Sequence, residues 1–142
     1  MRAAADGPSR RLADVVRDGG PSDVGVEVRS VSSTGGEKGV KVQRYDLIPP
    51  RALALLAEHY GRGALKYDGH NWRRGYEWSK SYSALMRHLQ AHWAGEDVDE
   101  ETGSLHLAAV AWHALTMLEF MAGGERFAKF DDRFVDGDEW DI

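Results

Sequence analysis

The chain has 142 residues, enough for one ordinary domain, and its formal net charge of −5 argues against a duplex-DNA binder with a basic face. Because the sequence contains no cysteine, disulfide bonds and thiolate zinc sites are excluded, and a metal ion would need histidine, carboxylate or water ligands. No continuous apolar stretch follows the arginines of the N-terminal region, so we expect neither a signal peptide nor a membrane span. These features predict a soluble cytoplasmic protein that binds small molecules.

The first part of the chain predicts an arm followed by a β-hairpin. Residues 1–22 mix glycine, proline, alanine and charged residues, which is typical of a flexible N-terminal arm. After them, apolar and polar residues alternate in two stretches separated by Ser33-Thr34-Gly35-Gly36, the pattern of two strands joined by a glycine-rich turn. The valines that carry this alternation are Val24, Val26, Val28, Val40 and Val42.

Three helices are expected in the rest of the chain. The first begins at Pro50, a residue suited to the first turn of a helix, and ends at Gly61. The second has Ser79 as its N-cap, carries apolar residues spaced three and four apart, and ends before Gly95. The third covers residues 104–121, is apolar on almost every side, and stops at a pair of glycines. Such a helix must be covered by its neighbours or by a second subunit.

A glycine-rich loop and an acidic tail complete the expected organisation. The loop, residues 61–78, contains the aromatic side chains Tyr67, Trp72, Tyr76 and Trp78, and at least two of the last three should anchor it in the core. The predicted fold is therefore mainly α, a small helical bundle with a short N-terminal β-hairpin. Residues 23–124 are expected to form the domain, and residues 125–142 the acidic C-terminal tail.

The region between the second and third helices has the strongest signal for chemistry. Five carboxylates occupy six consecutive positions in Glu96-Asp97-Val98-Asp99-Glu100-Glu101, a density that needs water, cations or arginines to relieve its repulsion. His88 lies on the preceding helix and His106 on the following one, so that both imidazoles converge on this junction. Oxygen ligands with some imidazole suit Mg²⁺ or Mn²⁺, ions that bridge phosphate oxygens and orient or activate water.

The same residues also have simpler interpretations. An acidic loop between two helices is often no more than a solvated turn. His92 and His113, each taken singly, are better explained as residues at the edge of an amphipathic core. The convergence of His88, the acidic loop and His106 on one junction favours a metal site over these alternatives.

Two segments carry groups suited to nucleotide binding. Residues 35–41 and Arg44 would present backbone amides and the cations Lys38 and Lys41 to an anion, and a solvated hairpin turn explains the same pattern equally well. This segment lacks the strand-to-helix Gly-Lys-Ser/Thr arrangement of a P-loop. The second segment combines a cation with an amide and aromatic rings, groups that bind phosphates, read base edges and stack on bases. Its candidates are Lys66, Tyr67, Asn71 and Trp72.

An ordered succession of motifs resembles a known family. In chain order these are Arg44-Tyr45-Asp46-Leu47-Ile48-Pro49-Pro50, Gly63-Ala64-Leu65-Lys66-Tyr67, Asn71-Trp72, Arg87-His88-Leu89, Gly95-Glu96-Asp97-Val98-Asp99 with Glu101 and Gly103, and His106-Leu107. Over residues 33–121 the chain resembles the phage dATP/dGTP diphosphohydrolase N-terminal family, the MazZ-like proteins. The Glu-Glu-x-x-Glu and Glu-x-x-Asp pairs of typical MazG enzymes are absent, and Lys41-Val42-Gln43 stands where that family often has lysine and proline.

The resemblance implies a helical, MazG-related pyrophosphohydrolase of bacteriophage origin, present in the host cytoplasm and assembled as a dimer or tetramer. The implied reaction is the Mg²⁺-dependent cleavage of a purine dNTP, dGTP or dATP or both, to the monophosphate and pyrophosphate. By position, Lys66, Tyr67, Asn71 and Trp72 match the nucleotide-side motif. The positions that match the motif near the metal are His88, Glu96, Asp97, Asp99, Glu101 and His106.

In the expected mechanism a divalent ion neutralises phosphate charge, while Lys66, helped by Lys38, Lys41 or Arg44, holds the polyphosphate. The candidates for the base that activates water are Glu96, Glu101 and His88. One alternative is a triphosphohydrolase of the histidine-aspartate type, although the chain contains no His-Asp dipeptide. The other is a non-catalytic nucleotide sensor or interaction module, in which the acidic loop binds a partner.

Overall fold

The computed structural model describes residues 28–40 and 43–134. The predicted arm at residues 1–22 lies outside the described residues, as do Val24, Val26, Lys41, Val42 and residues 135–142 of the predicted tail. The chain divides into two compact units, residues 1–48 and residues 49–142, which are taken in turn. No helix in the described part of the chain is long and apolar enough to cross a membrane.

The first unit contains the predicted β-hairpin. Strands β1 (Val28–Val31) and β2 (Glu37–Val40) pair in antiparallel fashion, with Val31 opposite Glu37. The amide of Ser32 donates to the carbonyl oxygen of Gly36 across the turn (2.8 Å), and Gly35 has a φ of 80°, a conformation that favours glycine. The hairpin is therefore confirmed. A short 3₁₀ helix, η2 (Tyr45–Leu47), follows it.

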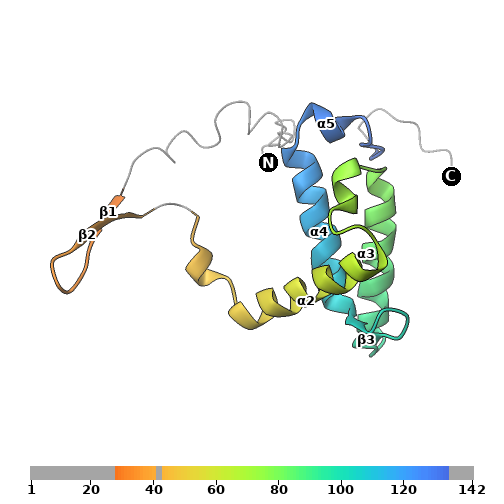
Figure 1. The fold of residues 1–142 in the computed structure, drawn as a ribbon, viewed down its shortest axis with the longest axis horizontal. Helices are drawn as coiled ribbons and strands as arrows, with labels where there is room; N and C mark the ends of the chain where they lie inside the picture. Colours follow the sequence, from red (N-terminus) through yellow and green to blue (C-terminus); the bar gives the residue numbers. More distant parts are fainter. Residues whose placement is uncertain (1–27, 41–42, 135–142) are drawn as a thin grey trace, which may run out of the picture. The chain divides into compact units, whose positions relative to one another are not determined.

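The second unit is built from helices. Its main helices are α2 (Pro50–Lys66), α3 (Trp78–Trp93) and α4 (His106–Ala122). The short elements are η3 (Asn71–Arg74), β3 (Val98–Asp99), β4 (Ser104–Leu105) and α5 (Glu125–Ala128). Helices α3 and α4 run antiparallel side by side, and the paired strands β3 and β4 lie at the end where they connect (Figure 1). The mainly α fold with a short N-terminal hairpin is thus confirmed.

Three predicted helix boundaries are wrong, each for a local reason. Helix α2 continues past Gly61 to Lys66, since Gly61 keeps a negative φ and good helix formers follow it. Helix α3 begins at Trp78 with Glu77 as its N-cap, so Ser79 lies in the first turn. Helix α4 begins at His106 because the two preceding residues pair with β3 as a strand.

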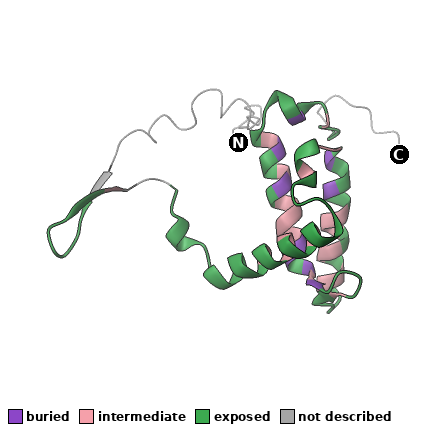
Figure 2. Ribbon diagram, viewed as in Figure 1, coloured by how far each residue is buried: buried purple, intermediate pink, exposed green. Residues whose placement is uncertain are grey.

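The core lies at the end of the bundle that carries α5. Trp78, Phe120 and Phe127 are 5%, 1% and 3% exposed, and they appear among the buried positions of α3, α4 and α5 (Figure 2). Trp72, Tyr76, Met121 and Phe130 are partly buried against them. The expectation that at least two loop aromatics anchor the core is borne out, whereas Tyr67 is 57% exposed.

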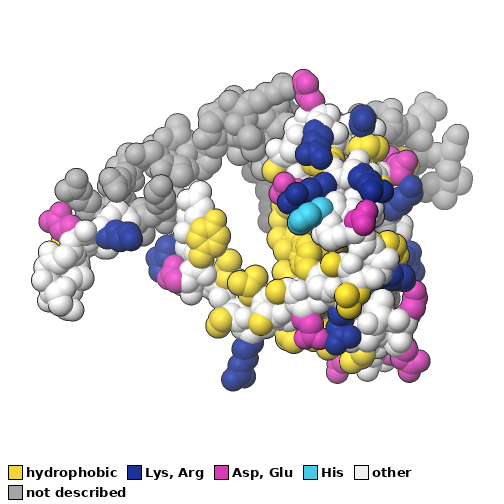
Figure 3. Space-filling view, viewed as in Figure 1, with side chains coloured by type: hydrophobic (Ala, Val, Ile, Leu, Met, Phe, Trp, Pro, Cys, Tyr) yellow, Lys and Arg dark blue, Asp and Glu magenta, His cyan; other side chains and the backbone are white. Residues whose placement is uncertain are grey.

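Apolar side chains remain exposed on two helices. On α4, Leu107, Leu115 and Leu118 are 47%, 42% and 53% exposed. On the first half of α2, Leu53 and Leu55 are 51% and 46% exposed, and hydrophobic side chains are visible along this helix (Figure 3). The neighbours within the chain therefore cover only part of the apolar surface of α4.

Candidate functional site

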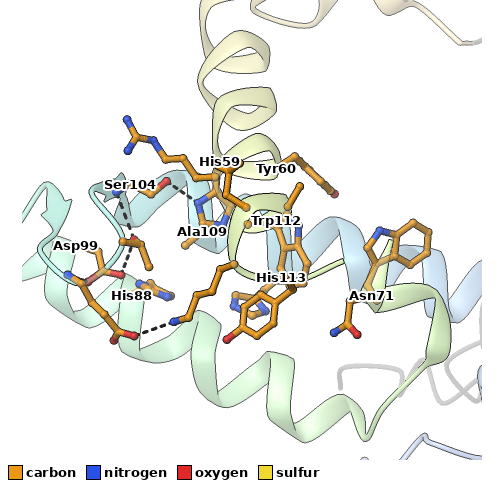
Figure 4. A pocket seen from close by; sticks show the side chains of 18 of the residues that line it. His59, Tyr60, Asn71, His88, Asp99, Ser104, Ala109, Trp112 and His113 are labelled. Atoms are coloured by element: carbon orange, nitrogen blue, oxygen red, sulfur yellow. Dashed lines mark hydrogen bonds and ion pairs between the residues drawn. The ribbon is translucent and has the colours of Figure 1, made fainter. Parts of the chain in front are cut away.

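A pocket of about 850 Å³ opens among α2, η3, α3, the β3–β4 hairpin and α4, all within the second unit. Asn71 lies at one end and Asp99 at the other, with His113 and Trp112 between them (Figure 4). This volume falls within the range of sites that bind small molecules. The predicted residues that line it are Lys66, Tyr67, Asn71, Trp72, His88, Asp99, Glu101 and His106.

Four histidines from three helices share this pocket. Nδ1 of His88 lies 2.9 Å from Nδ1 of His106, and the ring of His113 stacks on that of His88 at 6.1 Å between centroids. On the opposite side, Nδ1 of His59 lies 2.6 Å from Oγ of Ser104. The rings of His88, His106 and His113 therefore form one cluster, and the ring of Trp112 lies between this cluster and His59.

Burial keeps three of these imidazoles neutral near pH 7. It is the main cause that lowers the pKa of His59, His88 and His113 below that of an exposed histidine, and the positive charge of neighbouring histidines lowers each pKa further. For His113 the pKa falls to about 4. A neutral imidazole can accept a proton, which a charged one cannot.

The β3–β4 hairpin brings two carboxylates into the pocket. Asp99 accepts hydrogen bonds from Oγ1 of Thr102 (2.8 Å) and from the amide of Glu101 (3.1 Å). Burial is the largest single influence on Asp99 and raises its pKa, but these hydrogen bonds and the nearby His88 and His106 together lower the pKa overall. The carboxylate of Glu101 accepts from Nζ of Lys66 at 2.9 Å, and this hydrogen bond raises the pKa of the ammonium. One end of the pocket thus holds a cation beside two anions.

Two predicted residues of the acidic loop do not line the pocket. Asp97 instead has Oδ1 3.3 Å from Nδ1 of His92. Glu96 has Oε2 3.8 Å from Nε2 of His106, an atom that is buried without a hydrogen-bond partner. The loop therefore divides its carboxylates between the pocket and its outer side.

The predicted anion-binding segment belongs to the first unit. Lys38 lies in β2, and Arg44 is paired with Asp46, whose carboxylate is 2.6 Å from its guanidinium. Lys41 lies outside the described residues. A role for these three cations in phosphate binding stays a prediction.

The described carboxylates and imidazoles of the pocket do not by themselves form a complete cage for the metal ion that the sequence implies. Within residues 28–40 and 43–134, no group of three or more histidine or carboxylate side chains is placed to hold an ion. Mg²⁺, however, is commonly bound through one or two carboxylates together with water and substrate phosphates, rather than by a complete protein cage. Asp99 and Glu101 supply such a pair, so the residues present fit a Mg²⁺ ion that arrives with a polyphosphate.

Sequence reasoning did not find several pocket residues. His59 lies seven residues before Lys66, two turns along the same helix face, and this spacing could have identified it. Ser104, Tyr60 and Trp112 offered no comparable signal, because their place in the pocket depends on how α2 packs on α4. His113, interpreted as a core-edge residue, also lines the pocket.

The sequence of the chain matches a known protein family. The family described as "dATP/dGTP diphosphohydrolase, N-terminal" matches residues 32–133, well over half of the chain. The chain belongs to this family. Membership in the dATP/dGTP diphosphohydrolase family indicates a hydrolase that acts on deoxynucleoside triphosphates. No curated protein and no solved structure matches the sequence. The phage origin and the closer relation to MazZ-like proteins stay predictions.

Proposed function

We propose that the pocket binds a purine deoxynucleoside triphosphate with a divalent metal ion, Mg²⁺ or alternatively Mn²⁺, and cleaves it to the monophosphate and pyrophosphate. The observation that carries the proposal is the polarity of the pocket. Aromatic rings and an amide lie toward one end, and an ammonium group beside two carboxylates lies toward the other. A nucleotide has the same division between its base and its phosphates.

The base-binding end is formed by Tyr67, Asn71 and Trp72. The two rings offer faces on which a purine can stack, and the Asn71 amide offers both a donor and an acceptor to a base edge. Lys66 lies close to Tyr67, with Nζ 5.6 Å from the ring centroid, so its ammonium group can reach the phosphates next to the base-binding end. These residues bind and orient the nucleotide.

Asp99 and Glu101 would hold the metal ion, for the reasons of donor chemistry given above. When bound, the ion supplies neutralisation of phosphate charge and orientation of the phosphate oxygens. In the structure Nζ of Lys66 donates a hydrogen bond to Glu101. On substrate binding it would donate to a phosphate oxygen instead, and the Glu101 carboxylate would become available to the metal ion. The chain thus exchanges an internal ion pair for contacts with the substrate.

His88 is the best-placed base among the three predicted candidates. It lines the pocket, its pKa is lowered mainly by burial, and its second ring nitrogen is available when Nδ1 is paired with His106. Glu96 does not line the pocket, and Glu101 is paired with Lys66. His88 would take a proton from water as the water oxygen bonds to the α-phosphorus. The bond from that phosphorus to the bridging oxygen breaks, and pyrophosphate leaves.

Self-association is part of the proposal. The exposed leucines of α4 and of the first half of α2 are large apolar groups that a second copy of the chain would cover. A dimer or tetramer would complete the burial that α4 lacks within one chain.

Product analysis tests the reaction. The purified protein is incubated with dGTP or dATP and Mg²⁺, and the products are resolved by phosphorus NMR, with a sample containing EDTA as control. We expect equal amounts of monophosphate and pyrophosphate, and none with EDTA. Inorganic triphosphate with nucleoside would instead indicate the histidine-aspartate type of reaction. Nucleotide binding without any product would indicate a sensor.

A further inference from the structure

Asn71 and Trp72 line the pocket, and the segment that carries them, residues 71–78, here called the substrate-side wall, has little regular structure of its own. Asn71 and Trp72 lie in η3, a four-residue 3₁₀ helix without a side-chain cap. Short 3₁₀ segments have poor hydrogen-bond geometry, so their position depends on contacts from elsewhere. These contacts come from residues 125–133, here called the C-terminal clasp.

The first contact is a hydrogen bond to the backbone of the wall. Nη2 of Arg126 donates to the carbonyl oxygen of Arg73 at 2.8 Å. This carbonyl belongs to the peptide between Arg73 and Arg74, so the bond holds the backbone one residue beyond Trp72, which lines the pocket. A hydrogen bond from a charged donor is stronger than one between neutral groups.

The second contact caps α3. The N-cap residue of this helix, Glu77, makes no side-chain capping bond, and Asp132 supplies the missing acceptor from 53 residues away. Its carboxylate accepts from the amide of Ser79 (2.9 Å) and from the Ser79 hydroxyl, and these bonds lower the pKa of Asp132. An anion at this position satisfies an orphan amide and interacts favourably with the helix dipole.

The third contact is direct packing between η3 and α3. Gly75 joins the two elements with a φ of 76°, and a Cβ atom added there would lie 2.4 Å from Cε2 of Phe130. Phe130 also accepts a hydrogen bond at its carbonyl oxygen from the amide of Trp78 (3.1 Å). The clasp therefore contacts η3 at Arg73, the connection at Gly75, and the first turn of α3 at Trp78 and Ser79.

We infer that the C-terminal clasp sets the position of the substrate-side wall, with Arg126 acting as a positioning residue for nucleotide binding. The inference rests on the proposed function only in naming the nucleotide as the ligand. Because Asp99, Glu101 and His88 come from other elements, loosening the wall changes how tightly the nucleotide binds and leaves the bond-breaking groups in place.

Steady-state kinetics with Arg126→Ala tests whether the clasp affects nucleotide binding and not the bond-breaking step. We expect KM for dGTP to rise at least about threefold, with kcat within about twofold of wild type, as for a loss of binding alone. Arg126→Lys keeps a charged donor and should recover most of the loss. The matched control is Arg51→Ala, which removes the same charge from an exposed residue of α2 that belongs to neither the pocket nor the clasp. An unchanged KM in Arg126→Ala, or an equal rise in the control, overturns the inference.

Amide hydrogen exchange tests the effect of the clasp on the wall without depending on enzymatic activity. In Arg126→Ala the amides of residues 71–79 should exchange faster than in wild type and in Arg51→Ala, while those of α4 are unchanged. If wild type hydrolyses no dNTP, the proposed function fails and the exchange result alone decides the inference. Unchanged exchange at residues 71–79 contradicts the clasp whatever the activity.

Discussion

The partly buried histidine at position 113 links the pocket to the core. Its Nδ1 lies 3.2 Å from Oγ of Ser81, a fully buried hydroxyl that in turn lies 2.9 Å from the hydroxyl of Tyr76. His88, His59 and Arg87 face it from α3 and α2, and their positive charge adds to the effect of burial on its pKa. A proton on His113 therefore has no favourable position in the folded protein.

Stability should consequently depend on pH through His113. Its pKa is about 4 when folded and rises to the ordinary value of 6.5 when the chain unfolds, so only the unfolded state binds a proton between these values. The contribution is fully present above pH 6.5 and is lost as the pH falls toward 4. Urea unfolding at pH 7.5 and pH 4.5 should show a smaller pH-dependent loss in His113→Asn than in wild type. His70→Asn, which changes an exposed histidine, is the control. Equal losses in wild type and His113→Asn would refute this assignment.

At the residue scale, sequence motifs predicted which side chains line the pocket better than how those side chains are oriented in it. Eight of the predicted residues line the pocket, because the segments that carry the motifs at Lys66, Asn71 and Asp99 all border it. The orientation of the acidic loop was not predictable, since the pairing of Val98 with Leu105 determines which carboxylates face inward. His59 meets Ser104 across 45 positions, a separation that no local pattern reports.

At the scale of elements, Gly75 is the connection most sensitive to substitution. Gly75→Ala combines a left-handed φ with a Cβ atom in the space of Phe130, and should destabilise the fold by about 2–4 kcal/mol. Gly61→Ala is the matched control, because Gly61 lies within α2 with nothing within 4 Å of an added Cβ. It should stabilise the helix by about 0.5–1 kcal/mol. Urea unfolding measures both, and a Gly75→Ala variant as stable as wild type would contradict the packing described.

Helical periodicity predicted the three main helices, and long-range contacts explain where it failed. Ser79 has the chemistry of an N-cap, yet it lies in the first turn, where its amide and hydroxyl bond to Asp132. Residues 125–142 were predicted as an acidic tail held by a few aromatic side chains, and Phe127 within it is 3% exposed in the core. No pattern in the sequence indicates which surface these aromatics cover, because that surface forms only when α3 and α4 pack together.

At the scale of the whole second unit, basic and acidic side chains are concentrated at opposite ends of the helical bundle. Lysine and arginine side chains gather over the end that carries α5, and acidic side chains lie around the β3–β4 end (Figure 3). The pocket is lined both by residues of η3, which we propose bind the base, and by carboxylates of the acidic hairpin. Under the proposed function, phosphate chemistry would take place at the acidic end, where a divalent cation would relieve the repulsion among carboxylates.

The most direct measurement of this account is the rate of pyrophosphate release from dGTP by Asp99→Asn and by Glu100→Gln. Both remove one negative charge from the acidic loop, but Asp99 lines the pocket, whereas Glu100 is exposed and does not. Asparagine can still accept from the Glu101 amide at Oδ1 and can donate from Nδ2 to Oγ1 of Thr102, so the hairpin should keep its shape. We predict that kcat/KM falls by at least about 100-fold in Asp99→Asn and stays within about twofold in Glu100→Gln. Wild-type pyrophosphate release by a folded Asp99→Asn would contradict the assignment of this pocket as the active site.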